Sequence, residues 1–316
     1  MQQDTFLVRP MRMCGLFVAT ILALAAHGSA QDGLTATATA PAPATTEPKD
    51  SSQTVTPEDH YEFHFNAGAW LPRLGGKVTF GPSAAANEIS LEDSFNLDSS
   101  EAVGLFELGM RKNDAWGLNL SGFHFSTSSS GPFVGHEQFG SLTLNDGDRF
   151  NSSFDMTSIE GEFAYWPASW RPATHGVKGS EVDLWFAHFL ALRYLDVHQR
   201  VELSGGGTGG AGGGRESAGG DWLTPMVGLQ LHLHWYPPAG VPLLKGLEIG
   251  GAVALGPALG SDGGFITQIS AGITAFFTNQ IGLSFGYRLL EAHVEKDDYK
   301  FTGGLQGLFL AGTVHF

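Results

Sequence analysis

Eight charged side chains sit at alternate positions within largely apolar stretches, and they are the residues best suited to chemistry. Successive side chains of a β-strand point to opposite sides, so charges at such positions share one face. On that face they could form the selectivity lining of a channel, or pair in salt bridges that plug a narrow interior. The eight residues are Glu62, Glu107, Arg111, Glu160, Glu162, Arg193, Glu248 and Arg288.

Two histidines share one face of a single predicted strand. His232 and His234 could chelate a metal ion together with Glu162 or Glu248, because imidazole and carboxylate groups are common metal ligands. The spacing fixes no third ligand, however. We therefore expect both histidines to be held by hydrogen bonds inside the protein, and we predict no metal and no cofactor.

A further group of acidic and histidine residues falls near the predicted strand ends. Hydrolysis of a peptide bond would need an acidic residue and a histidine to converge on one water molecule. No pair in this group has a spacing that commits it to that task, so we predict that the protein is not an enzyme. The group consists of Asp196, His198, Glu202, Asp221, Glu291 and His293.

The elements that position these residues are ten segments in which apolar and polar side chains alternate. This period of two is typical of β-strands, and helical periodicity is hard to find after residue 60. The segments 71–80 and 139–144 also alternate and could be further strands or extensions of the others. The ten segments are 61–71, 102–111, 115–126, 155–166, 182–197, 222–236, 246–256, 265–277, 281–294 and 300–316.

Composition limits the class of protein further. The net charge of −15 argues against nucleic acid as a partner, because phosphate binding needs clustered Lys and Arg. The 44 glycines and 23 phenylalanines, with only 16% charged residues, suit short strands that have two differently solvated faces. The glycine tract 205–220 matches part of a dinucleotide-binding pattern but lacks the strand–helix context of a phosphate site.

The first 58 residues are predicted to lie outside the folded domain. Arg9 and Arg12 precede an apolar run that ends in the small residues Gly28-Ser29-Ala30, as in a secretory signal peptide. We predict cleavage after Ala30, which would also remove the single cysteine, Cys14. The following residues 31–58 are rich in Ala, Thr and Pro and are expected to be a disordered periplasmic tether. The folded domain is then 59–316.

Three features favour a membrane barrel over a soluble sandwich. The connections alternate between long and short, as in barrels with long external loops and short periplasmic turns. The eight charges would be buried in a sandwich, where isolated charges cost several kcal/mol each. Aromatic side chains also gather where the chain would cross the two membrane boundaries. The inner girdle would comprise Tyr61, Trp116, Tyr165, Phe186, Trp235, Phe277 and Phe316, and the outer one Tyr194, Phe265 and Tyr287.

The sequence resembles small Gram-negative outer-membrane β-barrel proteins of the OmpA-type or porin-like kind. The resemblance rests on the signal peptide, the alternating strands, Gly-Tyr-Arg at 286–288, Leu-Arg-Tyr-Leu-Asp at 192–196 and the terminal Phe316. Val314 and Phe316 fit the terminal assembly signal of these proteins. Ala311 holds the place where a glycine is common, and Gly312 follows it.

The resemblance implies a closed, all-β antiparallel transmembrane barrel of about ten strands in the cell outer membrane. Its expected partners are outer-membrane lipid, the barrel-assembly machinery and small solutes. The expected role is structural or passive, with the lumen either plugged by the charged network or forming a narrow channel. Two alternatives stay open: adhesion or ligand binding through the predicted loops 72–100, 127–151 and 198–221, and an omptin-like protease.

Overall fold

The computed structural model describes most of the chain after residue 60. The described residues are 61–81, 87–97, 99–112, 115–167, 173–175, 181–204, 213–238, 241, 243–260 and 262–316. The predicted signal peptide, 1–30, and the predicted tether, 31–58, lie outside them.

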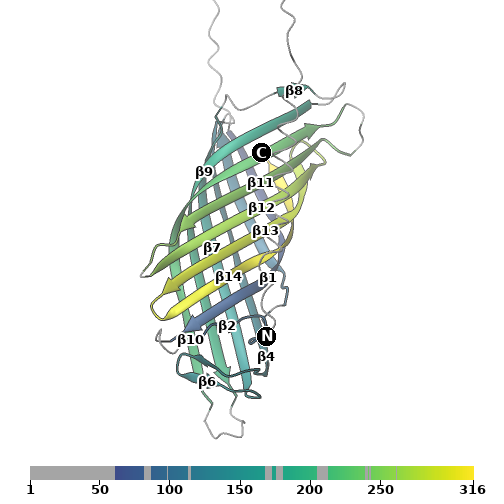
Figure 1. The fold of residues 1–316 in the computed structure, drawn as a ribbon. Coiled ribbons are helices and arrows are strands. Elements are labelled where there is room, and N and C mark those ends of the chain that lie inside the picture. Colours follow the sequence, from purple (N-terminus) through teal and green to yellow (C-terminus); the bar gives the residue numbers. More distant parts are fainter. Residues whose placement is uncertain are drawn as a thin grey trace, which may run out of the picture. The chain divides into compact units, whose positions relative to one another are not determined.

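Ten long strands form one closed antiparallel barrel within the described residues (Figure 1). Each strand pairs with the next along the chain, and the last strand pairs with the first, so the sheet has no free edge along its length. The ten strands are β1 (Tyr61–Phe80), β3 (Val103–Lys112), β4 (Trp116–Pro132), β7 (Arg149–Tyr165), β9 (Glu181–Leu203), β10 (Arg215–Tyr236), β11 (Gly246–Pro257), β12 (Gly263–Phe276), β13 (Ile281–Lys296) and β14 (Tyr299–His315).

Closure joins the two ends of the chain's folded part. Phe65 lies opposite Val314, and the pairing of β1 with β14 continues to Phe80 opposite Tyr299. Phe316 extends this ladder, since its backbone N–H donates to the Phe63 carbonyl at 2.9 Å. The expected all-β fold with ten strands is confirmed. Among the described residues, no helix is long and apolar enough to cross a membrane.

Several strands are longer than the alternation predicted. The strands β1, β4, β7, β9 and β10 continue into the segments that were expected to be the loops 72–100, 127–151 and 198–221. The continuation has a physical cause: inward positions such as Leu74 and Val78 stay apolar and buried, so extended backbone remains favourable there. Among the described residues, three short strands lie between these extensions, namely β2 (Ile89–Ser90), β5 (Glu137–Phe139) and β6 (Leu142–Leu144). A fourth, β8 (Ala173–His175), lies at the opposite end of the barrel.

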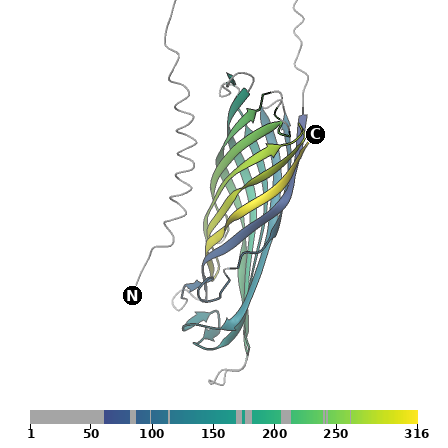
Figure 2. The ribbon, with the colours of Figure 1, turned by 90° about the vertical axis from the view of Figure 1, so that its right-hand side faces the viewer.

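The two ends of the barrel differ. Tyr61 and Phe316 lie at one end, here called the terminal end, together with the connections that follow β3, β7, β10 and β12 (Figure 2). At the other end, here called the loop end, the hairpin of β5 and β6 lies beyond the extended strands β4 and β7 (Figure 2). The connections follow the predicted alternation only in part. The two longest, after β1 and β4, lie at the loop end, but the turn between β13 and β14 at that end is shorter than the connection after β7 at the terminal end.

Large apolar side chains cover the outside of the barrel. They occupy the outward-facing positions of every strand. Because so large an apolar surface is unfavourable in water, the outer wall suits a lipid environment. Four of the seven residues of the predicted inner girdle, Tyr61, Tyr165, Phe277 and Phe316, are exposed on this surface, and the other three are partly exposed. Exposed members of the band include Leu71, Phe106, Leu108, Leu118, Leu120, Ile159, Phe163, Leu190, Leu192, Val227, Leu229, Leu255, Ile273, Leu283, Phe285, Leu308 and Leu310.

A charge placed in this band should be costly. Leu120 is 46% exposed and lies on β4 beside Leu118, another exposed member of the apolar band, so Leu120→Arg is expected to lower the free energy of unfolding in lipid vesicles by about 2–4 kcal/mol. Denaturant unfolding of the reconstituted barrel measures this loss. The matched control is Leu243→Arg, because Leu243 is 83% exposed in a turn at the terminal end and should tolerate the charge. Equal effects of the two substitutions would contradict the assignment of the band.

Candidate functional site

The inner wall changes character along each strand. On β1 the inward residues near the terminal end are Glu62, His64 and Asn66, whereas Trp70 and Leu74 follow towards the loop end and are fully buried. The same change occurs on other strands. The lumen therefore has a polar half at the terminal end and an apolar half at the loop end.

The apolar half is filled by side chains that meet across the barrel. Phe154 on β7 and Phe301 on β14 have ring centroids 5.4 Å apart, although three strands separate them around the wall. Trp70 and Phe123 also pack edge to face at 5.1 Å. We call this group the apolar core. Its main members are Trp70, Leu74, Val78, Phe123, Phe125, Phe154, Met156, Leu195, Val197, Trp222, Ile266, Leu290, Val294, Tyr299, Phe301 and Leu305.

Chain segments between the strands complete the apolar core at the loop end. Phe95 packs against Phe133, Phe139 and Phe150 with centroid distances between 5.7 and 6.1 Å. The β5–β6 hairpin is fastened to β1, because the Gly140 backbone N–H donates to the Phe80 carbonyl at 2.9 Å. The loop end is therefore closed by packed aromatic side chains.

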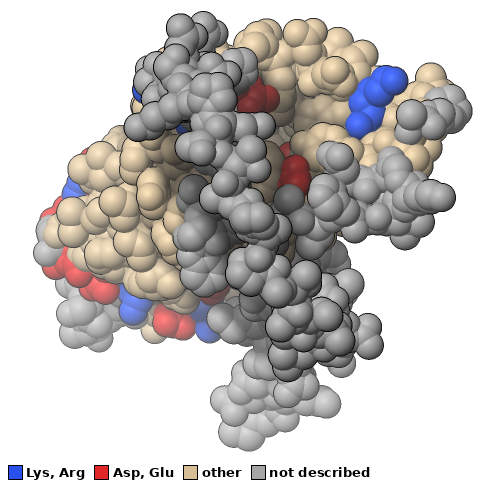
Figure 3. All heavy atoms as spheres, turned by 90° about the horizontal axis from the view of Figure 1, so that it is seen from above, with Lys and Arg blue, Asp and Glu red and all other residues tan. Residues whose placement is uncertain are grey.

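The polar half contains a cavity. It has a volume of about 310 Å³ and continues into a wider mouth of about 470 Å³ at the terminal end. Glu62, Arg111, Trp185, Glu248 and His315 line both volumes, so the two are continuous. Viewed from this end, acidic side chains are visible in the hollow between uncharged walls (Figure 3). We call the two volumes together the polar cavity.

The structure places all eight predicted lumen charges on the inner wall. Four of them form two arginine–glutamate ion pairs, and Glu107 and Glu248 each contact a histidine. At the mouth, Glu62 accepts from Arg111 Nη2 at 2.6 Å and approaches His315 Nδ1 at 2.9 Å. The Arg111 guanidinium also lies over the Trp185 ring, 4.6 Å from its centroid. These contacts tie β1, β3, β9 and β14 together around the opening.

The floor of the polar cavity is held by a buried pair. Glu160 and Arg193 are only 6% and 3% exposed, and Arg193 Nε donates to Glu160 Oε2 at 2.9 Å. Arg193 also donates to Gln268 across the lumen. Strand register explains the pair, because Glu160 on β7 lies directly opposite Arg193 on β9. The Glu160–Arg193 pair separates the polar cavity from the apolar core.

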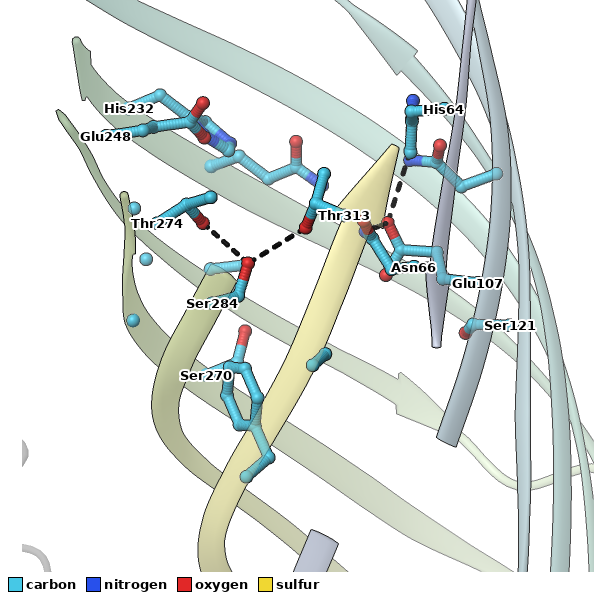
Figure 4. A pocket seen from close by; sticks show the side chains of 18 of the residues that line it. His64, Asn66, Glu107, Ser121, His232, Glu248, Ser270, Thr274, Ser284 and Thr313 are labelled. Atoms are coloured by element: carbon cyan, nitrogen blue, oxygen red, sulfur yellow. Dashed lines mark hydrogen bonds and ion pairs between the residues drawn. The ribbon is translucent and has the colours of Figure 1, made fainter. Parts of the chain in front are cut away.

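Contacts between imidazole and carboxylate groups join neighbouring strands in the wall of the polar cavity (Figure 4). His64 Nε2 lies 3.3 Å from Glu107 Oε1, which also accepts from Asn66 Nδ2 at 3.1 Å. His232 Nδ1 lies 2.7 Å from Glu248 Oε1. These two histidine–carboxylate pairs belong to different strand pairs, so they form separate clusters on the wall.

The two histidines of β10 do not act together. His232 bonds Glu248, whereas the His234 ring is stacked between Tyr236 at 4.2 Å and Phe276 at 5.7 Å. The prediction of a hydrogen bond is thus confirmed for His232, and ring stacking is what the structure records for His234. Among the described residues, no three His, Cys, Asp or Glu side chains are placed to hold a metal ion.

The acidic and histidine residues near the loop end lie on outward positions of the wall. Asp196 and His198 form one pair at 3.4 Å, and Glu291 and His293 form another at 3.2 Å. Asp221 accepts a hydrogen bond from Lys296 at 2.5 Å. Glu202 lies further along β9, opposite Arg215.

Two features of the site were missed by the sequence analysis. The apolar core was not expected, although the alternation along β1 assigns Trp70, Leu74 and Val78 to the inward face. The ring row of Tyr236, His234 and Phe276 was also missed, because it joins two strands whose relative register the sequence does not show.

No family model matches the chain, and no curated protein matches its sequence. In structure, the chain is similar to the outer membrane protease OmpT from Escherichia coli, with 9% identity, a TM-score of 0.41, and coverage of 83% of this chain and 98% of that one. It is also similar to the translocator domain of the autotransporter NalP from Neisseria meningitidis, with 9% identity, a TM-score of 0.30, and coverage of 97% and 98%.

A third similar structure is an outer membrane channel from Pseudomonas putida, with 12% identity and a TM-score of 0.29 over 85% of this chain and 100% of that one. At such identities the function has to be inferred from the lumen of this chain itself.

Proposed function

We propose that the chain is a closed outer-membrane barrel with a structural or passive role, and that its terminal end faces the periplasm. The observation that carries the proposal is the apolar core, in which Phe154 and Phe301 meet across the lumen. The orientation is supported by the two longest connections, which follow β1 and β4 at the loop end, because outer-membrane barrels place their long loops outside the cell.

A narrow channel would need a continuous hydrated path. The charged residues that could line one stop at the Glu160–Arg193 pair, and fully buried apolar side chains occupy the lumen beyond it. An ion that entered this packed region would lose its hydration and meet only a few neutral polar groups, such as Gln199 and Thr224, which costs many kcal/mol. The charged network therefore contributes to closure at the floor, and the apolar core provides the rest.

Ion current across a planar bilayer tests the proposal. The purified full chain should insert without producing steady current under conditions in which an open trimeric porin conducts. Glu160→Gln and Arg288→Gln should also remain silent, because neither substitution removes the apolar core. A steady wild-type current that either substitution changes would overturn the closed barrel and favour a porin-like channel.

We also propose that the barrel-assembly machinery recognises the last strand through Val314 and Phe316. Phe316 is 65% exposed on the outer wall, while both its backbone groups bond Phe63, so its ring is available without loosening the ladder. Deletion of Phe316 is expected to lower the amount of folded barrel in the outer membrane several-fold, measured by heat-dependent gel mobility of membrane fractions. Phe277→Ala is the control, because Phe277 is a comparable exposed girdle residue away from the last strand. Normal membrane levels after the deletion would contradict this role.

A further inference from the structure

The charges of the polar cavity are not all matched. Six of the eight charges contact an oppositely charged side chain or a histidine. Glu62 bonds Arg111, Glu160 bonds Arg193, Glu107 contacts His64, and Glu248 contacts His232. The two that remain are Glu162 and Arg288. Both line the same cavity, and no ion pair joins them.

Arg288 presents an unused guanidinium group. Its side chain makes no hydrogen bond with any of the described residues, and its Nε is buried without a partner. Arg288 points from β13 into the innermost part of the polar cavity, where the nearest charges are those of Glu107, Glu160, Glu162 and Arg193. A buried guanidinium group without a bonded anion is unfavourable, so Arg288 favours a ligand that carries an anionic group.

Glu162 is oriented by neutral donors and has no cationic partner within hydrogen-bond distance in the described part of the chain. Its Oε1 atom accepts hydrogen bonds from Asn119 Nδ2 at 2.9 Å and from Gln230 Nε2 at 2.8 Å. Both donors are neutral amides, so they fix the direction of the carboxyl group and bring no opposite charge to it. A further unused acceptor lines the same cavity, because Asn66 Oδ1 is buried without a hydrogen-bond partner among the described residues.

The surrounding charges restrict the kind of ligand. A simple anion at Arg288 would meet the repulsion of Glu107, Glu160 and Glu162. A simple cation beside Glu162 would leave the buried Arg288 guanidinium without a bonded anion. A molecule that carries both an anionic and a cationic group can place the anionic group beside Arg288 and the cationic group beside Glu162. Trp185 and Phe276 at the continuous mouth would cover an apolar part of such a molecule.

We propose that the polar cavity binds small zwitterionic molecules that carry a carboxylate and an ammonium group, such as free amino acids with an apolar side chain. The carboxylate pairs with Arg288, and the ammonium group pairs with Glu162 and Asn66 Oδ1. The site opens only toward the terminal end in this structure, because the apolar core closes the other side. A cavity of about 310 Å³ with a wider mouth has room for a single amino acid.

Three probes that share one benzyl group separate the two charges. L-Phenylalanine carries both, 3-phenylpropionate lacks the ammonium group, and 2-phenylethylamine lacks the carboxylate. Titration calorimetry of the full chain in detergent micelles should show L-phenylalanine binding about tenfold or more tightly than either analogue, since a charge-assisted hydrogen bond contributes roughly that factor. Absence of L-phenylalanine binding, or equal binding of all three probes, would overturn the proposal.

Two substitutions assign the charges to their residues. Glu162→Gln should abolish the preference for L-phenylalanine over 3-phenylpropionate and keep the preference over 2-phenylethylamine, and Arg288→Gln should have the opposite effect. Lys77→Gln is the control, because Lys77 lies in an exposed pair with Glu88 at the loop end. Heat-dependent gel mobility confirms that each variant is folded. Variants that are folded but leave both preferences unchanged would refute the site, whether or not the barrel conducts ions.

Discussion

Arg193→Gln is expected to destabilise the barrel by about 3–5 kcal/mol, because it leaves a carboxylate buried without its partner. Glu160 is 6% exposed and its contact with Arg193 is the only ion pair recorded for it among the described residues. Urea unfolding of the barrel in lipid vesicles, followed by tryptophan fluorescence, measures the loss. A loss below about 1 kcal/mol would show that the pair contributes little to the cavity floor.

The double variant Glu160→Gln with Arg193→Gln separates charge from shape. Two neutral amides of similar size can bond each other, so most of the lost stability should return. Lys77→Gln provides the exposed comparison, since its pair with Glu88 is more than half exposed on both sides and should contribute less than about 1 kcal/mol. Equal losses from Lys77→Gln and Arg193→Gln would contradict the burial of the floor pair.

Phe301→Ala is expected to cost about 3–5 kcal/mol, because it empties the centre of the apolar core. The Phe301 ring is fully buried and lies 5.4 Å from the Phe154 ring on a distant part of the wall. The same unfolding assay measures the effect. Phe285→Ala is the matched control, because Phe285 is 53% exposed to the lipid side and leaves no cavity in the lumen.

A double-mutant cycle tests whether the two rings touch across the lumen. Phe154→Ala alone should cost a similar amount, and the two substitutions together should cost less than their sum by about 0.5–1.5 kcal/mol. Additive losses would mean that the rings are independent and that the lumen is wider than the structure shows.

Much of the fold was predictable from the sequence because parity is a strong signal. Polar residues alternate with the apolar residues Phe106, Leu108, Leu118 and Leu120. A shift of one residue in strand pairing would expose those polar groups to lipid, so the alternation assigned the outward face correctly. Strand ends were less predictable. The Ser-rich part of β4 extends to Pro132, where the sequence analysis expected a loop, because its partner β7 supplies a continuous ladder.

The site was predictable only in part. The parity of Glu160 and Arg193 showed that both face inward, but the register that places them opposite each other comes from the folded sheet. Similarly, nothing in the spacing of Glu162 and Arg288 distinguishes them from their paired neighbours. Their difference depends on which side chains converge from strands far apart in the chain.

The central claim is that the lumen opens at the terminal end alone, and the sided reaction of one cavity cysteine tests it most directly. The background carries Cys14→Ser, and three variants add a cysteine: Ser270→Cys in the polar cavity, Asn279→Cys at the terminal end and Asp146→Cys at the loop end. Each is reconstituted in vesicles and treated from outside with a small, charged, membrane-impermeant thiol reagent.

Asn279→Cys and Asp146→Cys report the fraction of barrels in each orientation, because the two residues lie at opposite ends and are exposed. The closed barrel predicts that the labelled fraction of Ser270→Cys equals that of Asn279→Cys. Labelling of Ser270→Cys in every barrel, whichever end faces the reagent, would show an open path through the apolar core and contradict the account.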